Sequence, residues 1–372
     1  QYSSLGPILF FGHRLMSFAR KHCKMNELQY GSMSGKQAQS AVLNKILTYD
    51  LIRLTKQDAA TSEFDAAANY DRILPALAMI ACQRLGLAEK PAELLYNSLV
   101  DLKHQVKTIY GLSAEYGSTR LHPLHGTGQG SGGSPTFWAV IADVLFNSMD
   151  SQGKGLVFNN PRNDVVSARN EDGYVDDTAL GVDGRDGKVT ARITTAAQRH
   201  ERILYATGGK LALHKCAWVL MTWIWREGEA ILQTHPEEAD GTCTAASSEQ
   251  FKVEQSESGV WVVIPRLNPT RGYRTLGIWI AADGNQNAQL ERMQTLVSVW
   301  LDNIAASSLS AQDKYLAYTS FLRPQLVFPI GCSTIERKTL KKLFRPVLDR
   351  IMHTQGLNKN FPLALVHAGP EW

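Results

Sequence analysis

The sequence predicts a soluble α+β fold in two or three lobes, on three observations. The 372 residues exceed one small module, at roughly 100–200 residues per domain. Apolar residues make up 44% and charged residues 20%, so the chain can bury a core and is not a disordered tail. Segments with helical spacing alternate with short strand-like runs, and no apolar run approaches the ~20 residues of a membrane span.

The first half of the chain alternates helices and strands in a clear order. Helical spacing appears over 41–54 and again from 73 to 85, where Pro75 in the first turn loses no hydrogen bond. A glycine-rich loop at 126–134 then opens an apolar helix that runs from Pro135 to about Met149.

The central elements place acidic residues at the end of a strand and on a turn. Asp65 ends a predicted strand, and residues 173–181 predict a β-hairpin with adjacent acids at its tip. Residues 190–206 predict another helix, which ends at Gly208-Gly209, and strand-like sequence resumes over 210–225.

The C-terminal part changes in composition and then becomes helical. Residues 226–258 hold eight acids against two bases, which predicts a solvated, mobile insertion. Residues 261–264 and 275–280 predict strands, and apolar positions over 290–304 predict an amphipathic helix. We expect helices to continue to about residue 355, with Pro346 kinking or splitting the last one.

The net charge limits how the chain could bind nucleic acid, and the cysteine content indicates the kind of cellular compartment. The net charge of +4 excludes a polycation, so any nucleic-acid contact needs a local basic surface. The five cysteines form no CxxC pair, which argues against a disulfide framework and against a cysteine zinc site. We expect an intracellular protein, nuclear or cytoplasmic, with no secretion or membrane signal. The chain begins with Gln1, and we interpret it as a fragment cut at both ends.

Three carboxylates predict the chemistry. Asp65 and the pair Asp176-Asp177 are 111 positions apart, so only folding brings them together. Two-metal phosphoryl transfer needs such a cluster, because two Mg²⁺ ions about 3.5–4 Å apart prefer carboxylate oxygens. Without metal the three groups would repel and one would take up a proton. Because side chains alternate along a strand, we expect Asp65 and Asp176 as firm ligands and Asp177 as auxiliary. The alternative is ordinary solvated turn chemistry.

Five motifs in order resemble the palm motifs of reverse transcriptases, with the closest likeness to non-LTR retrotransposon and group II intron enzymes. They are Phe64-Asp65 through Asp71, Gly128-Gln129-Gly130 through Pro135, Tyr174-Val175-Asp176-Asp177, Gly209 through Lys215-Cys216, and Leu276-Gly277. Gln29-Tyr30-Gly31 also looks like a retroelement motif that precedes the palm. The resemblance covers about residues 25–280.

The resemblance implies a right-hand polymerase with three parts. These are partial fingers over 1–60, an antiparallel palm with packed helices over 61–284, and a helical thumb and C-terminal region over 285–372. It also implies an RNA-directed DNA polymerase that extends a DNA or RNA primer on an RNA template with dNTPs. Its cofactor would be two Mg²⁺ ions, with Mn²⁺ as a substitute. Protein partners stay unknown.

Carried over position by position, the resemblance gives the nucleotide site four residues. The backbone carbonyl of Ala66 would complete one metal shell, and Tyr70 would lie under the incoming sugar and exclude a 2′-hydroxyl. Gln129 and Gly130 would contact the nucleotide and the template. The alternative for Tyr70 is a packed core tyrosine.

Cations complete the predicted site. By the same resemblance, Lys215 would act as general acid to the departing pyrophosphate, and a solvated lysine is the alternative. On the last helix, Lys341, Lys342 and Arg345 would lie along phosphates while an apolar stripe packs; an ordinary solvated face is the alternative. A Lys and an Arg that grip the triphosphate in the family have no recognisable match upstream.

Several rival functions stay open. Gly128 to Gly133 satisfies GxGxxG, although the preceding residues suit no buried strand and so disfavour a dinucleotide enzyme. His122 and His125 are a possible metal pair without a third ligand nearby. The other rivals are an RNA-directed RNA polymerase and a catalytically inactive RNA-binding scaffold related to reverse transcriptases.

Overall fold

The computed structural model divides the chain into two compact units, Gln1–Pro269 and Thr270–Trp372. The sequence placed the last boundary after residue 284 instead. The structure describes residues 5–22, 24–119, 125–128, 132–153, 155–160, 162, 164–184, 187–237, 242–243, 250–354 and 356. Predictions for His122, Gln129 and Gly130 lie outside these residues.

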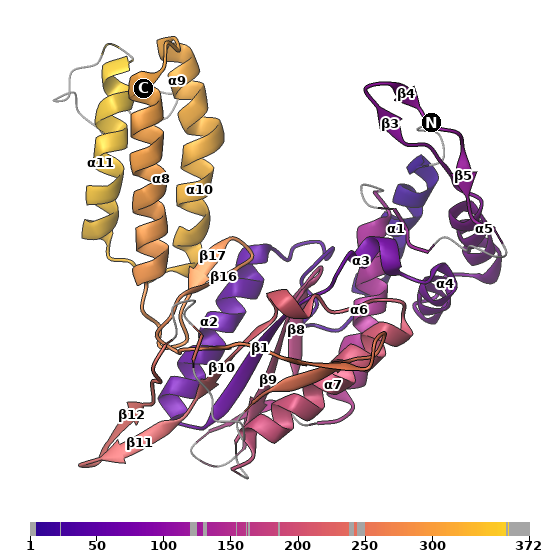
Figure 1. The fold of residues 1–372 in the computed structure, drawn as a ribbon, viewed down its shortest axis with the longest axis horizontal. Coiled ribbons are helices and arrows are strands. Elements are labelled where there is room, and N and C mark those ends of the chain that lie inside the picture. Colours follow the sequence, from indigo (N-terminus) through magenta and orange to yellow (C-terminus); the bar gives the residue numbers. More distant parts are fainter. Residues whose placement is uncertain are drawn as a thin grey trace. The chain divides into compact units, whose positions relative to one another are not determined.

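The first unit is built on a five-stranded sheet of order β15-β10-β1-β9-β8 (Figure 1). The strands are β1 (Ala59–Asp65), β8 (Glu171–Tyr174), β9 (Asp177–Asp183), β10 (Ala217–Met221) and β15 (Arg266–Leu267). Neighbours pair antiparallel except β10 with β15, which run parallel. The predicted antiparallel sheet, and the strand that ends at Asp65, are confirmed.

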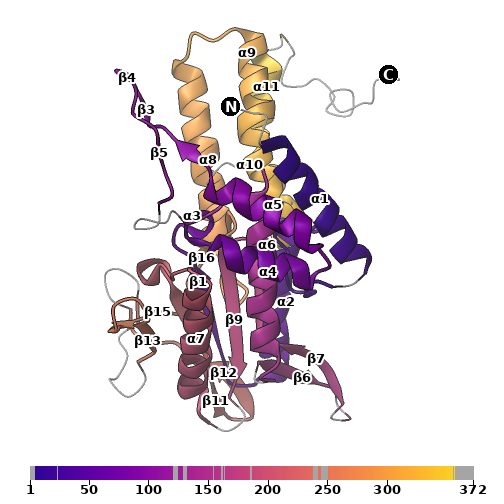
Figure 2. The ribbon, with the colours of Figure 1, turned by 90° about the vertical axis from the view of Figure 1, so that its right-hand side faces the viewer.

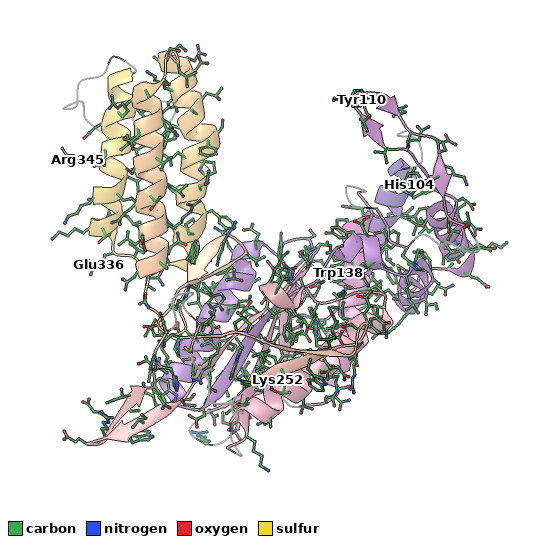
Figure 3. All side chains as sticks on the ribbon, in the orientation of Figure 1. His104, Tyr110, Trp138, Lys252, Glu336 and Arg345 are labelled. Carbon is green, nitrogen blue, oxygen red and sulfur yellow. The ribbon has the colours of Figure 1, made fainter. Side chains whose placement is uncertain are left out.

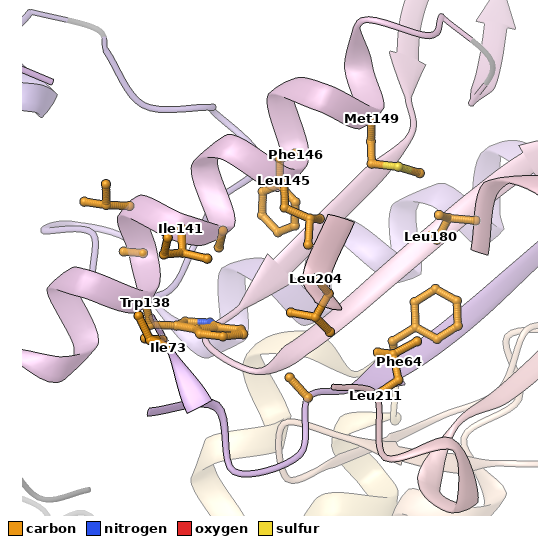
Figure 4. Close-up of a cluster of buried hydrophobic side chains, with 14 of the residues drawn as sticks. Phe64, Ile73, Trp138, Ile141, Leu145, Phe146, Met149, Leu180, Leu204 and Leu211 are labelled. Atoms are coloured by element: carbon orange, nitrogen blue, oxygen red, sulfur yellow. The ribbon is translucent and has the colours of Figure 1, made fainter. Parts of the chain in front are cut away.

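Two helices, α6 (Ser134–Asp150) and α7 (Val189–Ala206), cover one face of this sheet. Figure 4 shows the apolar side chains between them and the strands. The cluster includes Phe64, Trp138, Ile141, Leu145, Phe146, Leu180, Leu204 and Leu211. Both helices were predicted, because their apolar positions recur at helical spacing.

A third helix, α2 (Ala38–Thr55), contacts β8 at the edge of the sheet. It also reaches the face of β1 opposite to the α6 side, because the hydroxyls of Tyr49 and Thr61 lie 2.9 Å apart. This face carries Asp65 and Asp177 farther along the same strands, since residues two apart on a strand share a face.

The segments before and after β1 build a helical cluster with a projecting arm. Its helices are α1 (Leu5–Lys21), α3 (Asn69–Arg72), α4 (Pro75–Arg84) and α5 (Glu89–Val100). Pro75 begins α4 as predicted. The arm consists of β2 (Lys103–His104), β3 (Lys107–Thr108), β4 (Gly111–Leu112) and β5 (Tyr116–Gly117). Tyr110 lies at its tip (Figure 3).

Three short hairpins complete the first unit. They are β6–β7 (Leu156–Asn159 and Val165–Arg169), β11–β12 (Trp223–Arg226 and Glu229–Leu232) and β13–β14 (Lys252–Gln255 and Val260–Val263). The stretch 210–225 was expected to be strand-like throughout. It instead contains a 3₁₀ turn, η1 (Leu213–Lys215), before β10 and β11.

The prediction of a solvated insertion over 226–258 is wrong for its last part. Phe251 and Val253 are fully buried, and Phe251 meets Trp218 edge-on at 5.6 Å between ring centroids. These two apolar residues are two positions apart, so a strand turns both inward while the neighbouring charges face out. The average acidity of the segment hid this alternation.

The second unit begins with the hairpin β16–β17 (Tyr273–Thr275 and Ile278–Ile280) and continues as helices. These are α8 (Asn287–Ala306), α9 (Ala311–Ala317), the π-helical turn η3 (Tyr318–Leu322), α10 (Arg323–Val327), the 3₁₀ turn η4 (Phe328–Cys332) and α11 (Arg337–Thr354). They enclose a separate core around Met293, Trp300 and Val347. The predicted helix over 290–304 is confirmed as part of α8, but the predicted strand over 275–280 is wrong, because a turn at Leu276-Gly277 divides it into the hairpin β16–β17.

The last helix runs through Pro346 without interruption, so the predicted split is wrong. Pro346 is exposed, and water can satisfy the backbone carbonyl that loses its partner there. Among the helices described here, none is both long and apolar enough to cross a membrane.

Candidate active site

Asp65 and Asp177 are direct partners across the central strands. β1 and β9 pair in antiparallel register with Asp65 opposite Asp177. Side chains of directly opposed residues point to the same face, with Cβ atoms roughly 4.5–5.5 Å apart. The fold therefore brings together two of the three acids, although more than a hundred residues separate them in sequence.

Asp176 belongs to the two-residue turn that joins β8 to β9, as the sequence predicted for the hairpin. The backbone carbonyl of Asp176 accepts a hydrogen bond of 3.3 Å from the amide of Ala66, the residue after Asp65. This bond ties the tip of the hairpin to the end of β1. All three acids thus lie at one end of the sheet.

The turn contains a strained residue. Val175 has a φ of +59°, a left-handed conformation that is a true outlier for a β-branched side chain. Such strain costs of order 1–3 kcal/mol and persists only where the surroundings impose it. Here the indole nitrogen of Trp138, from α6, donates to the carbonyl of Val175.

The segment Gln29-Tyr30-Gly31 holds the same turn from outside. The amide of Tyr30 donates to the carbonyl of Gly173 at 2.9 Å, and the amide of Gly173 donates to Leu28 at 3.2 Å. A Cβ on Gly31 would lie 2.4 Å from the amide nitrogen of Val175. Glycine is therefore required at position 31 for the segment to pack against the hairpin.

Burial, reinforced by electrostatic repulsion within the cluster, raises the pKa of two acids. Burial raises the pKa of Asp177 to about 6, with further contributions from the charges of Asp176 and Asp65. Burial, and then the charge of Asp65, also raises the pKa of Asp176. Without a bound cation, Asp177 therefore takes up a proton as the pH falls through about 6, well above the range of an ordinary aspartate.

Lys215 neutralises part of this charge. Its ammonium lies 3.2 and 3.3 Å from the two carboxylate oxygens of Asp65. The turn η1, which carries Lys215, is positioned by a hydrogen bond of 2.8 Å from the amide of Ala212 to the carbonyl of Asp65. A lysine thus stands beside the acids.

The donor set suits hard divalent cations. Three carboxylates meet at the end of the sheet, and the pKa values of two of them, Asp176 and Asp177, are raised, so a dication would stabilise these two groups in the ionised state. Within the described residues, no three His, Cys, Asp or Glu side chains have gathered closely enough to hold a metal as they stand. The ion pair between Lys215 and Asp65 is the observed counter-charge.

The other predicted nucleotide-site residues lie at the same end of the sheet where they are described. Ala66 is buried directly after Asp65. Tyr70 is half-buried on α3, and burial followed by the charge of Asp176 raises its pKa, which indicates that the phenol lies near the acids. The glycine-rich loop is fastened nearby, since the amide of Thr127 donates to the carbonyl of Tyr70 at 2.7 Å.

A buried polar cluster, which the sequence did not predict, lies on α2 and the strands that carry the acids. Lys45 on α2 forms an ion pair with Glu63, two residues before Asp65. Asp172 accepts from Asn44 at 2.6 Å and pairs with Arg169 at 3.4 Å. The pattern that predicts this cluster is the helical spacing of α2, which puts Lys45 on the buried face with Ala41, Val42, Thr48, Tyr49 and Ile52.

The predicted phosphate-binding cations belong to the second unit. Lys341, Lys342 and Arg345 are all exposed on α11, while Leu343 and Val347 on the same helix are buried. Arg345 lies 3.7 Å from Asp349, a contact between two largely exposed groups that contributes little. The helix is amphipathic in the predicted sense.

The structure does not favour the dinucleotide alternative. The last strands described before Gly128, β2 to β5, form small antiparallel pairs outside the main sheet. A dinucleotide loop instead follows a buried parallel strand. His125 is exposed, so the described half of the histidine pair lies at the surface.

Comparison with known proteins gives structural similarity only. No family model and no curated protein matches the chain. Solved structures of telomerase are similar to it, including that of Candida albicans with a fragment of telomeric RNA, at 14% identity and a TM-score of 0.41. That match covers 97% of this chain and 52% of the telomerase chain.

Two structures of telomerase from Candida tropicalis are also similar. One, with a fragment of telomeric RNA, has 13% identity and a TM-score of 0.41 over 95% of this chain and 51% of its own. The apo structure has 11% identity and a TM-score of 0.40 over 94% and 54%. The chain thus spans about half the length of the structures it matches, and the function proposed below rests on the chain's own residues.

Proposed function

We propose that the chain is part of an RNA-directed DNA polymerase of a retroelement, which extends a DNA or RNA primer with dNTPs on an RNA template. The observation that carries the proposal is the pairing of Asp65 with Asp177 across β1 and β9, with Asp176 on the adjoining turn. This arrangement supplies carboxylates where phosphoryl transfer requires divalent cations.

Asp65, Asp176 and Asp177, with the carbonyl of Ala66, would hold two Mg²⁺ or Mn²⁺ ions. When bound, such ions activate the attacking 3′-hydroxyl and stabilise the charge on the leaving pyrophosphate. The chain itself contributes the strained, fastened turn that fixes Asp176, and the cross-strand pair that fixes the other two acids.

Four further residues have roles in the proposed reaction. The side-chain nitrogen of Lys215 lies beside Asp65 and would deliver charge or a proton to the pyrophosphate. Tyr70 would place its ring against the incoming sugar and exclude a 2′-hydroxyl, which favours deoxynucleotides. Gln129 and Gly130 would contact the nucleotide and template strand.

The larger layout belongs to the same proposal. Residues 1–60 would form partial fingers, the sheet and its helices the palm, and the helical second unit the thumb. Lys341, Lys342 and Arg345 on α11 would contact the phosphates of the primer–template duplex.

Primer extension tests the proposal. The full chain is incubated with poly(rA)/oligo(dT), dTTP and Mg²⁺ or Mn²⁺, and compared with Asp176→Asn and with the surface control Asp302→Asn. We expect extension by the wild-type chain and the control, and loss of at least a hundredfold in Asp176→Asn. Incorporation of UTP in preference to dTTP would instead assign an RNA polymerase. Binding of the RNA without any extension would assign an inactive scaffold.

A further inference from the structure

Apart from the candidate active site, a groove lies on the side of α7 that faces away from the sheet. The groove has a volume of about 440 Å³, within the roughly 300–1,000 Å³ typical of ligand sites. It is lined by Thr194, Thr195, Gln198, Arg199, Arg202, Ile203 and Trp261. All but the last belong to α7, and Trp261 comes from β14.

This groove is separate from the candidate active site. Helix α7 packs on the sheet through Ile193, Ala197 and Leu204. His200 of the same helix lies 5.0 Å from Phe64 between ring centroids. Because side chains alternate along β1, Phe64 points away from the face that carries Asp65. The groove therefore lies on the other side of the sheet from the acids, beyond α7.

Hydrogen bonds fix the two walls of the groove to each other. The amide of Glu254 on β13 donates to the side chain of Gln198 at 2.7 Å, and the same side chain donates back to the carbonyl of Glu254 at 2.9 Å. The amide of Ser256 also donates to buried Glu201 at 2.9 Å. Figure 2 shows β13 close to α7, and their residues are in contact. The groove is thus preformed.

The register of the hairpin brings Trp261 to the groove. Trp261 lies opposite Glu254 in the β13–β14 pair, so both point to the same face. The indole is 55% exposed, although the same hairpin buries Val253 completely. A large flat apolar surface is therefore left open beside α7.

Two arginines line the same groove as this indole. Arg202 is 65% exposed and lies 3.5 Å from Glu254, a marginal contact. Arg199 is half-buried and forms no ion pair with any other residue that the structure describes. Arginine matches phosphate geometry with its planar fork, and an exposed aromatic ring stacks on any base.

We propose that this groove binds a single-stranded polynucleotide, with one base stacked on Trp261 and the flanking phosphates on Arg199 and Arg202. The threonine hydroxyls would supply additional hydrogen bonds. The site lies outside the proposed polymerase site and does not depend on it: a strand would bind here whether or not the acids support catalysis.

Equilibrium binding tests the proposal. Fluorescence anisotropy of a fluorescein-labelled, unstructured 12-nucleotide RNA is measured with the full chain in EDTA, at several salt concentrations. We compare Trp261→Ala and the double variant Arg199→Gln, Arg202→Gln with the matched control Trp225→Ala, another exposed tryptophan on a hairpin. We expect about tenfold weaker binding for the first two and no change for the control. The double variant should also lower the salt slope by about one.

Crosslinking locates the site and separates it from the acids. An RNA containing 5-iodouracil is irradiated with the chain, and the adduct is mapped by mass spectrometry. We expect an adduct at Trp261 that persists in Asp176→Asn and disappears in the double arginine variant. The absence of any adduct at Trp261, with adducts only at other residues, or Trp261→Ala binding within twofold of wild type, would overturn the proposal. If millimolar UMP displaced the labelled RNA, the groove would be a site for free nucleotides and not for a polynucleotide.

Discussion

At the scale of residues, Asp177 shows most clearly that the candidate site lowers the stability of the folded chain when its acids are ionised. Its carboxylate lies among two other acids and is half-buried, so the pKa is raised to about 6. Such a group is more stable protonated in the folded chain than in the unfolded one. The repulsion among the three acids destabilises the fold, and a bound cation or a proton relieves it. The cluster therefore serves no purpose in folding alone.

The pH dependence of Asp177→Asn follows from this shift. Since the folded pKa exceeds the ordinary value of 3.8, the contribution to stability is complete below pH ~4 and is lost as pH rises through about 6. The full shift corresponds to roughly 3 kcal/mol, and solvent screening reduces this to ~1–2 kcal/mol. In EDTA at pH 7.5, urea unfolding should therefore show Asp177→Asn to be more stable than wild type by that amount, and equally stable at pH 4.

The control for this measurement is Asp302→Asn, an exposed change on α8 that should leave the free energy of unfolding unchanged. Added Mg²⁺ should stabilise the wild-type chain more than Asp177→Asn. Loss of stability in Asp177→Asn at pH 7.5 would contradict the repulsion, because it would show that the ionised carboxylate makes net favourable contacts.

Sugar discrimination tests the proposed role of Tyr70. Replacement by valine removes the ring and opens space for a 2′-hydroxyl. In primer extension we expect Tyr70→Val to raise incorporation of UTP relative to dTTP by about tenfold, equivalent to ~1.4 kcal/mol of discrimination. Tyr110→Val, on the exposed tip of the arm, is the control. Equal discrimination in the two variants would assign Tyr70 to the core alone.

At the scale of elements, the hairpin β8–β9 depends on its neighbours for its conformation. Its turn combines a strained Val175, a hydrogen bond from Trp138 on α6 and the packed segment around Gly31. Helix α6, the segment around Gly31 and the hairpin itself thus all contact the two-residue turn Val175-Asp176. Positions that hold a strained turn in this way are expected to affect activity more than stability.

Gly31→Ala separates these two effects. The added Cβ would lie 2.4 Å from the backbone nitrogen of Val175, so the segment or the turn must shift. We expect a loss of about 1–3 kcal/mol in the free energy of unfolding and at least a tenfold fall in primer extension. Gly272→Ala is the matched control, because its Cβ would lie 2.3 Å from that of Ala288 in the second unit. Equal loss of extension in both variants would indicate a general effect of destabilisation.

The long elements were predictable and the short ones were not. Helices such as α6 and α8 and the hairpin with the acids carry enough residues for periodicity and turn chemistry to appear. The two-residue strands of the arm carry no such pattern, and the inward alternation of Phe251 and Val253 was hidden by surrounding charge. The helical spacing of α2 puts Lys45 on the buried face, but the pairing of Lys45 with Glu63 and the positive φ of Val175 arise only from tertiary packing, so no local pattern specifies them.

At the scale of the whole molecule, charge is spread across two units with separate cores. The net charge is only +4, which gives little general attraction to a polyanion. Strong binding to a primer–template duplex therefore requires cations gathered at particular places. The exposed face of α11 is one such place, with Lys341, Lys342 and Arg345 opposite a buried stripe.

Two triple variants of equal net charge test whether the exposed face of α11 binds the primer–template duplex. Changing Lys341, Lys342 and Arg345 to glutamine lowers the net charge from +4 to +1, and so does changing exposed Lys90, Arg226 and Arg274. If α11 contacts phosphates, only the first triple variant should weaken binding of a labelled RNA–DNA duplex, by at least tenfold, and lower its salt slope by about 2–3. Anisotropy titrations from 50 to 200 mM salt measure both quantities. Equal weakening by the two triples would show that total charge, not the face of α11, governs binding.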